Sequence, residues 1–455
     1  MKAVPADFLA LLHCPYCGFG LETESMDAIA GAVRYGILRC ACHEYPVVEG
    51  IPILQQIDGL QRVVQLIRSM DRSRALSRAL DLFRVQWAHR SRLHRLKYYW
   101  NCKRLVSRSD ESFRDAVHLV RRPGVFADYL MHRYANPSFL AAIGLLPVLA
   151  RLARPSAAPA SAARVLDLAC GAGHASYLMQ LLGPTLSIVS ADQDFVNVYL
   201  ARRFLVPEGL HLCIDAQAPN PLPDRYFDAV YCQDAFHYVH SKKAAVAELK
   251  RVVHPDALWI FPHLHNRLCH NLVPGLPLSP DAYLECFALP GGRLFSESDL
   301  LRGLSAERLV DLSAWVPAAT LNNAPNLTFV RGGDETWGIH RDFPSAFCRQ
   351  ASALQANPIY DVRPEGNGLR LERRWPNTVM AQECSEADSV VPQSCHLSGE
   401  QMLQLRTGWT GTAPSWLEDL VASFVLVPLP DGYSRDPAIR VGDLRLDALA
   451  GQARA

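Results

Sequence analysis

The chain has 455 residues, which is long enough for two or three domains that each bury a core of their own. Hydrophobic residues make up 49% of the sequence and charged residues 20%, a composition that excludes a largely disordered or coiled-coil protein. The formal net charge is +1, although residues 60–135 are locally basic.

Two features of the sequence bear on its cellular location. Residues 1–12 lack a basic segment followed by a long apolar run, and no stretch of about eighteen uncharged apolar residues occurs. The thirteen cysteines are an odd number, and those after Cys42 do not follow the spacing of a disulfide framework. We therefore expect a cytoplasmic protein with reduced cysteines and no membrane partner.

Changes in the hydrophobic pattern divide the chain into four segments. They are a β-rich N-terminal module (1–56), a helical and basic connector (57–152), an α/β core (160–332) and a C-terminal extension of unknown role (333–455). The boundary before the core is rich in Ala, Pro and Ser over 153–163, which is typical of a linker.

The N-terminal module contains two close cysteine pairs, Cys14-Pro-Tyr-Cys17 and Cys40-Ala-Cys42. This spacing is typical of two knuckles that hold one tetrahedral metal ion. Four thiolates would saturate a structural Zn²⁺ and leave no open position for catalysis. Because the second pair is C-x-C, His43 is an alternative to Cys42 as the fourth ligand. Four reduced cysteines without a metal are the competing interpretation, although so small a module otherwise has too little core.

The connector shows apolar residues at helical spacing, separated by Arg and Ser. Its middle part interleaves aromatic and basic side chains: Trp87, Tyr98, Tyr99 and Trp100 with Arg84, Arg90, Arg92, Arg95, Lys97, Lys103 and Arg104. Such a mixture can follow a nucleic-acid backbone and stack on bases, so RNA is a possible partner. A helical face packed on an acidic neighbour in the same chain also explains the pattern, and the near-zero total charge favours it slightly.

In the core, short apolar strands alternate with helical stretches, which is the rhythm of a parallel α/β sheet. The expected strands are 165–168, 186–191, 210–214, 229–232 and 258–261. After them we expect a helix over 296–304 and two strands, 309–315 and 327–331, that close the sheet as an antiparallel pair. Residues 272–288 are expected to form a lid, an inference that rests on their place after the fifth strand. Strand-like pieces of the extension occur at 369–373 and 424–427.

The first core strand runs into a glycine-containing turn, Asp167-Leu-Ala-Cys-Gly171-Ala-Gly173, which a helix follows. Without Cβ atoms, Gly171 and Gly173 let a nucleoside and an amino-acid carboxylate approach the main chain at the helix N-terminus. The turn departs from the nicotinamide fingerprint G-x-G-x-x-G, because Ala169 takes the first glycine position and no third glycine follows. A pyrophosphate cradle is therefore disfavoured, and a generic tight turn is the alternative.

Acidic residues recur where the next strands are expected to end, at Asp192, Asp215 and Asp234. A carboxylate after the second strand fits a ribose diol, whose two hydroxyls donate to one acid. We therefore assign Asp192 to a ribose. The alternative for Asp192 and Asp215 is an N-cap or a solvated loop acid, and for Asp234 a helix cap competes evenly with a catalytic role.

The segment from Asp167 to Gly173 resembles motif I of the class I S-adenosylmethionine (SAM)-dependent methyltransferases in its D-x-x-C-G-x-G form. Residues 227–237 also resemble that family's fourth strand and following loop, and the likeness covers about 164–331. It implies an α/β, Rossmann-like core that binds SAM, with the methionine moiety at motif I, the ribose at Asp192 and the adenine amino group at Asp215. The implied cofactor-binding residues are Asp167, Ala169, Gly171, Gly173, Asp192, Gln193, Asp215, Ala216 and Gln233.

The cysteine module, together with residues 45–54, resembles the zinc-ribbon activator family of tRNA and translation-factor methyltransferases. The resemblance implies a structural zinc on Cys14, Cys17, Cys40 and Cys42. It also implies that the ribbon packs on the core or assists substrate binding.

Methyl transfer from a sulfonium needs few catalytic groups, because the protein mainly holds the acceptor in line and excludes water. A hydroxyl or ammonium acceptor must lose a proton, and a histidine is the usual base. His237, His263 and His265 fall at strand ends that should face the acceptor. We expect His237 and then His263, with Asp234, to be catalytic; a structurally satisfied histidine is the alternative for each.

Three functions are compatible with these features. The leading hypothesis is a methyltransferase for a small-molecule acceptor, with the lid and the C-terminal extension forming the acceptor pocket. The second is a methyltransferase for RNA or a translation-related protein, gripped by the ribbon and the basic connector. The third is a noncatalytic SAM-binding scaffold. The sequence determines neither the methylated atom nor the oligomeric state, and a SAM-dependent reaction other than methylation would use the same pocket.

Overall fold

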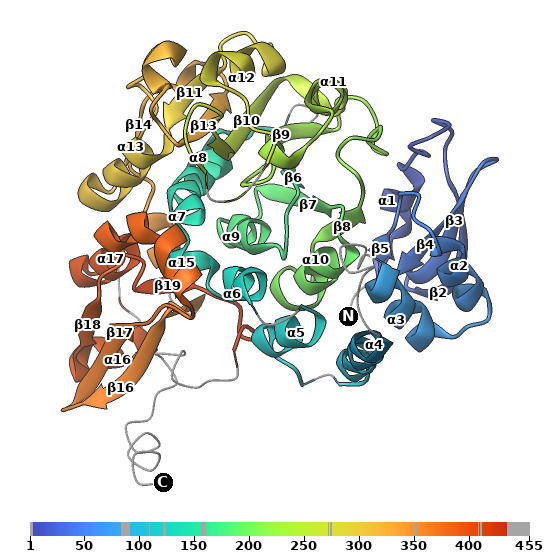
Figure 1. The fold of residues 1–455 in the computed structure, drawn as a ribbon, viewed down its shortest axis with the longest axis horizontal. Coiled ribbons are helices and arrows are strands. Elements are labelled where there is room, and N and C mark those ends of the chain that lie inside the picture. Colours follow the sequence, from blue (N-terminus) through green and yellow to red (C-terminus); the bar gives the residue numbers. More distant parts are fainter. Residues whose placement is uncertain are drawn as a thin grey trace.

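A seven-stranded sheet lies at the centre of the core (Figure 1). Its strands are β6 (Ala163–Leu168), β7 (Leu186–Asp192), β8 (Leu210–Cys213), β9 (Phe227–Tyr231), β10 (Val253–His265), β11 (Arg293–Ser296) and β13 (Asn326–Arg331). The computed structural model describes residues 3–82, 92–108, 110–121, 124–155, 161–271, 273, 275–349, 353–407, 409 and 412–434.

The order of the strands across the sheet explains where a ligand can bind. Across the sheet the strands lie in the order β8-β7-β6-β9-β10-β13-β11. If the seven strands are numbered as they occur along the chain, this order is 3-2-1-4-5-7-6. The first five are parallel, and β13 is antiparallel to both of its neighbours, β10 and β11. This is the doubly wound order of nucleotide-binding folds with one antiparallel strand inserted. The winding direction reverses between β6 and β9, and such sheets bind ligands at the carboxyl ends of the strands at that point.

The predicted class I, Rossmann-like core is thus confirmed. Its central strands are buried on both faces, which is why they read as nearly continuous apolar runs. The helices of the core are α9 (His174–Leu181), α10 (Phe195–Leu200), α11 (Lys242–Val252), α12 (Pro280–Phe287) and α13 (Glu297–Arg302).

The antiparallel edge of the sheet differs from the prediction in one strand. The expected strand at 327–331 is present as β13, but its outer partner is β11 and not residues 309–315. The latter contain only β12 (Val310–Asp311), which pairs with β14 (Ile339–His340) outside the main sheet. β11 is four residues long and directly precedes α13, so its sequence signal merges with that of the helix.

The N-terminal module is a small sheet that docks on the edge of the main sheet. Its strands are β1 (Val4–Pro5), β2 (Glu22–Ile29), β3 (Ala32–Arg39), β4 (Glu44–Val48) and β5 (Ile51–Pro52), with helix α1 (Ala6–Ala10). Ile53 forms an isolated parallel bridge with Cys213 of β8, and the N–H of Leu54 donates to the Cys213 carbonyl at 2.9 Å. The module therefore covers the open edge of the main sheet and shares its buried core.

The connector runs from the module across the core to the carboxyl end of the sheet (Figure 1). Its helices are α2 (Leu60–Arg68), α3 (Arg72–Leu82), α4 (Arg92–Ser107), α5 (Phe113–Val120), α6 (Val125–Met131), α7 (Pro137–Ile143) and α8 (Leu145–Leu152). Arg84, Trp87 and Arg90 of the predicted basic and aromatic stretch lie outside the described residues.

The C-terminal extension packs against the connector. Its elements are α14 (Ser345–Cys348), β15 (Leu354–Ala356), β16 (Tyr360–Glu365), β17 (Gly368–Arg373), α15 (Thr378–Glu383), β18 (Ser394–Leu397), α16 (Gly399–Thr407), α17 (Ser415–Ala422) and β19 (Leu426–Pro428). Asn377 donates to Asp128 of α6 at 2.6 Å, and Asn357 donates to the carbonyl of Tyr134 at 2.8 Å. The hydroxyl of Tyr433 donates to the carbonyls of α6 and contacts the ring of His174 in α9. The extension thus holds the connector against the core.

None of the described helices combines the length and apolar character that crossing a bilayer requires.

Candidate functional site

A cavity of about 680 Å³ opens at the carboxyl ends of the parallel strands. All the predicted cofactor-binding residues except one line it: Asp167, Ala169, Gly171, Asp192, Gln193, Asp215, Ala216 and Gln233. They come from the carboxyl ends of the first four strands of the core and from the loops that follow, which meet at this edge because those strands are parallel. The exception, Gly173, is not part of the cavity wall.

The two glycines of the turn after β6 act differently. Both have positive φ, +56° for Gly171 and +86° for Gly173, a conformation that glycine adopts without strain. A Cβ at Gly171 would meet no atom within 4 Å, so the space beside this glycine is open to a ligand. A Cβ at Gly173 would lie 2.7 Å from the Cβ of Ala201. Gly173 therefore serves the close packing of α9 on the next helix.

Ala169, at the first position of the turn, has a φ of +58°. This left-handed conformation costs a non-glycine residue conformational energy, and such strained residues are concentrated at functional sites. The cavity wall includes Ala169.

Two buried carboxylates lie beside this turn. Asp192 accepts hydrogen bonds from the N–H groups of Gly171 at 2.9 Å and Asp194 at 2.8 Å, so it joins the turns after β6 and β7. Asp167 accepts a hydrogen bond from the hydroxyl of Ser176. Burial raises the pKa of Asp192 to about 6 and that of Asp167 to about 7. A cationic ligand would favour the ionised form of both acids.

The opposite wall of the cavity comes from the connector, and the sequence predicted no cofactor-binding or catalytic residue there. Phe126, Tyr129, Leu130, Arg133 and Phe139 line this wall. The guanidinium of Arg133 lies over the rings of Tyr129, at 4.3 Å, and Phe139, at 5.1 Å. The available signal was a group of aromatic side chains around Arg133 in a helical stretch. The predicted lid, 272–288, was wrong: its described residues contribute nothing to the cavity wall, and α12 packs its aromatic side chains into the core instead.

Asp234 is where the connector and the core meet. Its Oδ2 accepts hydrogen bonds from the hydroxyls of Tyr129 at 2.6 Å and Ser138 at 3.0 Å, and Arg133 lies 3.3 Å away. Burial alone would raise the pKa of Asp234, but the positive charges of His263 and Arg133 hold it well below its usual range. Asp234 has a φ of +55° and caps no helix; it is an ionised carboxylate at the cavity wall.

His263 lies behind Asp234 between two carboxylates. Its Nδ1 is 2.7 Å from Glu297, and its Nε2 is 3.7 Å from Oδ1 of Asp234. Burial would lower the pKa of His263, yet these two acids raise it to about 9. The imidazole is therefore protonated at neutral pH, and it does not line the cavity.

His237 and His265 form a second layer behind the same wall. Their rings stack with centroids 3.7 Å apart and planes 13° from parallel. Burial lowers the pKa of His237 to about 3 and that of His265 to about 4, each with help from a neighbouring histidine. Both rings are thus neutral, and neither is among the cavity-lining residues.

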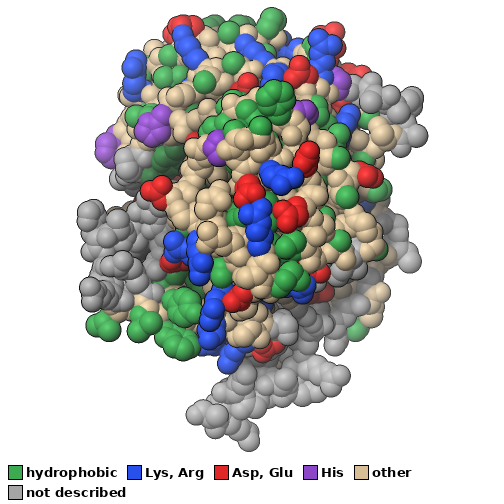
Figure 2. Space-filling view, turned by 90° about the vertical axis from the view of Figure 1, so that its right-hand side faces the viewer, with side chains coloured by type: hydrophobic (Ala, Val, Ile, Leu, Met, Phe, Trp, Pro, Cys, Tyr) green, Lys and Arg blue, Asp and Glu red, His purple; other side chains and the backbone are tan. Residues whose placement is uncertain are grey.

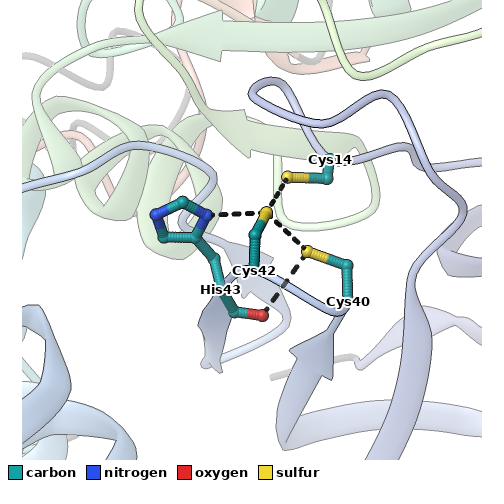
Figure 3. Close-up of side chains that lie close together, drawn as sticks. All are labelled: Cys14, Cys40, Cys42 and His43. Atoms are coloured by element: carbon teal, nitrogen blue, oxygen red, sulfur yellow. Dashed lines mark hydrogen bonds between the residues drawn. The ribbon is translucent and has the colours of Figure 1, made fainter.

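Three cysteines of the module, Cys14, Cys40 and Cys42, lie close together beside His43 (Figure 3). The Sγ of Cys42 lies 3.6 Å from that of Cys14, 3.3 Å from that of Cys40 and 2.9 Å from Nδ1 of His43. In a tetrahedral zinc site with Zn–S bonds of about 2.3 Å, sulfur atoms are about 3.8 Å apart, so the donor set fits this ion. Burial opposes ionisation of Cys14, but hydrogen bonding, with Tyr45 first, outweighs it and lowers the pKa to about 6. The thiolate is the form that binds metal.

Four side chains of the module lie close enough to share one metal ion. Cys14, Cys40, Cys42 and His43 have ligand atoms that all lie within 4.8 Å of one another. Cys17, the remaining predicted ligand, is not part of this group. The structure thus brings both predicted alternatives for the fourth ligand to the same place.

Comparisons with known proteins agree with the topology. Residues 166–261 match the family described as "Methyltransferase domain". Three similar solved structures are a SAM-dependent methyltransferase from Aquifex aeolicus, a TehB-like SAM-dependent methyltransferase from Corynebacterium glutamicum, and the complex of the Haloferax volcanii Trm112 methyltransferase activator with a methyltransferase. No curated protein matches the chain.

The structural similarity is confined to part of this chain. The Aquifex structure is 18% identical over 43% of this chain and 96% of its own, with a TM-score of 0.27. The corresponding values are 15%, 38%, 82% and 0.26 for the Corynebacterium structure and 16%, 43%, 92% and 0.31 for the Haloferax complex. The family match assigns a methyltransferase domain to residues 166–261, and the strand order gives the core that contains them a Rossmann-like fold.

Proposed function

We propose that this enzyme transfers the methyl group of SAM to a small molecule held in the same cavity. The observation that carries this proposal is that the connector of the same chain forms a second wall opposite the core. Its volume of about 680 Å³ falls in the range of about 300–1,000 Å³ that is typical of small-ligand sites. The connector forms the outer wall, and the C-terminal extension fastens the connector from behind. A folded RNA or protein substrate would have to displace both segments.

The core wall of the cavity fits SAM. The open space beside Gly171 lets the donor lie against the main chain, and Asp192 is placed for the ribose hydroxyls. SAM supplies an activated methyl group on a positively charged sulfonium. Ionised Asp167 and Asp192 complement the positive charges of such a ligand. Asp215, with Ala216 beside it, lines the cavity after β8, and we assign it to the adenine.

Asp234 is the predicted catalytic residue that reaches the cavity, and we assign it the contact with the acceptor. Its carboxylate accepts a hydrogen bond from the acceptor's hydroxyl or amino group and orients that group. Arg133 and His263 are positioning residues that keep Asp234 ionised. The aromatic side chains of Phe126, Tyr129 and Phe139 exclude water from the reacting atoms.

The charge distribution gives RNA no advantage as the acceptor. On the face that Figure 2 shows, basic and acidic side chains are interspersed. Arg68 pairs with Glu44 at 2.6 Å, and Arg104 and Arg108 each lie 3.5 Å from Glu111. Arginines already paired within the chain offer less charge to a phosphate backbone.

The N-terminal module holds a structural Zn²⁺ on the thiolates of Cys14, Cys17, Cys40 and Cys42, with His43 as the alternative to one of them. Its task is to fold the module, which covers the edge of β8. Gln55, at the end of the module, also donates to the carbonyl of Gln193 at 2.8 Å, which couples the module to the cavity wall.

The acceptor class is tested by the fate of a labelled methyl group. We expect the enzyme, given methyl-labelled SAM and a cell extract, to label molecules in the low-mass fraction. Asp234→Asn should lower the rate by on the order of 100-fold, since it removes the charge at the acceptor contact. Asp256→Asn, an exposed acid at the other end of the sheet, is the matched control. Label on RNA or protein, with none in the low-mass fraction, would refute a small-molecule acceptor.

A further inference from the structure

A second group of metal-binding side chains lies beside the cavity, far along the chain from the cysteines. The ligand atoms of Asp234, His237 and His265 all lie within 4.8 Å of one another. Asp234 and His237 follow β9, and His265 ends β10, so the two neighbouring parallel strands bring the three together. Asp234 and Tyr238 place the group directly behind the cavity wall.

The two histidines are buried and have ring nitrogens without hydrogen-bond partners among the described residues. His237 is fully buried and His265 is 5% exposed. Within the part of the chain that the structure describes, neither ring nitrogen of His237 and not Nδ1 of His265 has a partner. Leaving a buried polar group unpaired costs about 1–3 kcal/mol, so such groups call for an explanation. A metal ion bound between the two rings would take one nitrogen of each.

Asp234 offers one oxygen to this group. Its Oδ2 is taken by Tyr129 and Ser138, which fix the orientation of the carboxylate. Its Oδ1 faces the histidines, with Nε2 of His263 at 3.7 Å. Hydrogen bonds thus anchor one oxygen, as the outer partners of metal ligands do, and an ion bound to the other oxygen would take the place of its ion pair with His263.

The rings of His237 and His265 stack at present, so an ion bound by both requires one ring to turn about its terminal side-chain torsion. The turn breaks no hydrogen bond for His237, because its ring nitrogens have none among the described residues. Such terminal torsions have broad wells, which makes the rearrangement small.

We propose that Asp234, His237 and His265 bind a divalent first-row transition metal ion such as Zn²⁺, Fe²⁺ or Co²⁺. Two neutral imidazoles and one carboxylate form a donor set that suits these ions and leaves coordination positions open. Of the three proposed ligands, Asp234 forms part of the cavity wall and the two histidines lie behind it. If the proposed function holds, the acceptor's oxygen or sulfur binds at an open position of the ion, in place of a direct hydrogen bond to Asp234, and the ion lowers the pKa of that acceptor group. The metal site itself does not depend on SAM binding.

Cobalt distinguishes this site from the cysteine cluster, because only the cysteines give thiolate-to-cobalt charge-transfer absorption. The full chain, loaded anaerobically with Co²⁺ under reducing conditions, is expected to bind two equivalents. One should show the charge-transfer bands and the other only weak d–d bands of nitrogen and oxygen ligands. His237→Gln and His265→Gln should each lose the second equivalent and keep the first. His211→Gln is the matched control, since His211 is 1% exposed and also has an unpartnered ring nitrogen.

A wild-type chain that binds only the thiolate-coordinated equivalent would overturn the proposal, whatever the variants do. Retention of both equivalents by His237→Gln would overturn it as well. Titration with S-adenosylhomocysteine (SAH), the product of methyl transfer, is made on the same samples. If the wild-type chain lacks the second cobalt equivalent but still binds SAH, the result contradicts the proposed metal site and leaves the proposed function standing. Absence of SAH binding with both metals present contradicts the proposed function and leaves the metal site standing.

Discussion

Gly171→Val is expected to lower the affinity for SAM by at least about 100-fold. The valine side chain would occupy the space beside the turn that no protein atom fills within 4 Å of the Cβ position. At a φ of +56° a β-branched residue also costs roughly 1–2 kcal/mol, which would shift the turn away from its bound shape. A loss of about 2.7 kcal/mol of binding free energy corresponds to 100-fold. Isothermal titration of the variant with SAM and SAH measures it.

The control variant Gly366→Val separates the effect of backbone strain from the effect of filling the ligand's space. Gly366 lies in the turn between β16 and β17, has a φ of +60° and, like Gly171, has no atom within 4 Å of its Cβ position. It therefore carries the same backbone strain at a distance from the cavity. We expect wild-type affinity in this control. A folded Gly171→Val protein that binds SAH within about threefold of the wild type would exclude the turn as the donor site.

Cys14→Ser should have the largest effect on stability. Cys14 belongs to either of the two alternative ligand sets, and its thiol is 2% exposed. Structural zinc contributes about 10–16 kcal/mol of binding free energy in zinc-finger peptides, and the metal binds only the folded form. We expect the variant to lose one zinc equivalent per chain and to unfold its module. The uncovered β8 edge should make the rest of the chain aggregate on heating.

Metal analysis and thermal denaturation test this together. Cys384→Ser is the matched control, because Cys384 is also buried but lies in the C-terminal extension, far from the module. It should keep its zinc. If Cys14→Ser retained a full equivalent in the thiolate site, or lost the metal with no change in the melting temperature, a structural zinc at this cluster would be excluded.

The parts of the site that were predictable lie in local motifs. Asp167 to Gly173 and Asp192 follow strands whose apolar runs are plain in the sequence, and parallel pairing then brings these loops to one edge. The sheet and most of the donor wall follow from that rule. The short strand β11 was not predicted, because four residues next to a helix show too little hydrophobic periodicity to be recognised as a strand.

The acceptor side was not predictable for a different reason. Its wall depends on tertiary packing of the connector against the core, for example Tyr129 on Asp234, which lies 105 positions later. No spacing rule links such residues. The roles of His237 and His263 depend on which groups surround each ring: His263 lies between two acids and is charged, whereas His237 is buried without partners. Burial and pairing of this kind come only from the folded chain.

The most direct test of the central claim is a crystal structure of the full chain with SAH. The account predicts SAH in the 680 Å³ cavity, with its methionine part against the Gly171 turn, its ribose hydroxyls on Asp192 and its adenine near Asp215. The sulfur should point toward Asp234, where the acceptor binds. SAH bound elsewhere, or no binding by well-folded, zinc-loaded protein at millimolar SAH, would contradict it.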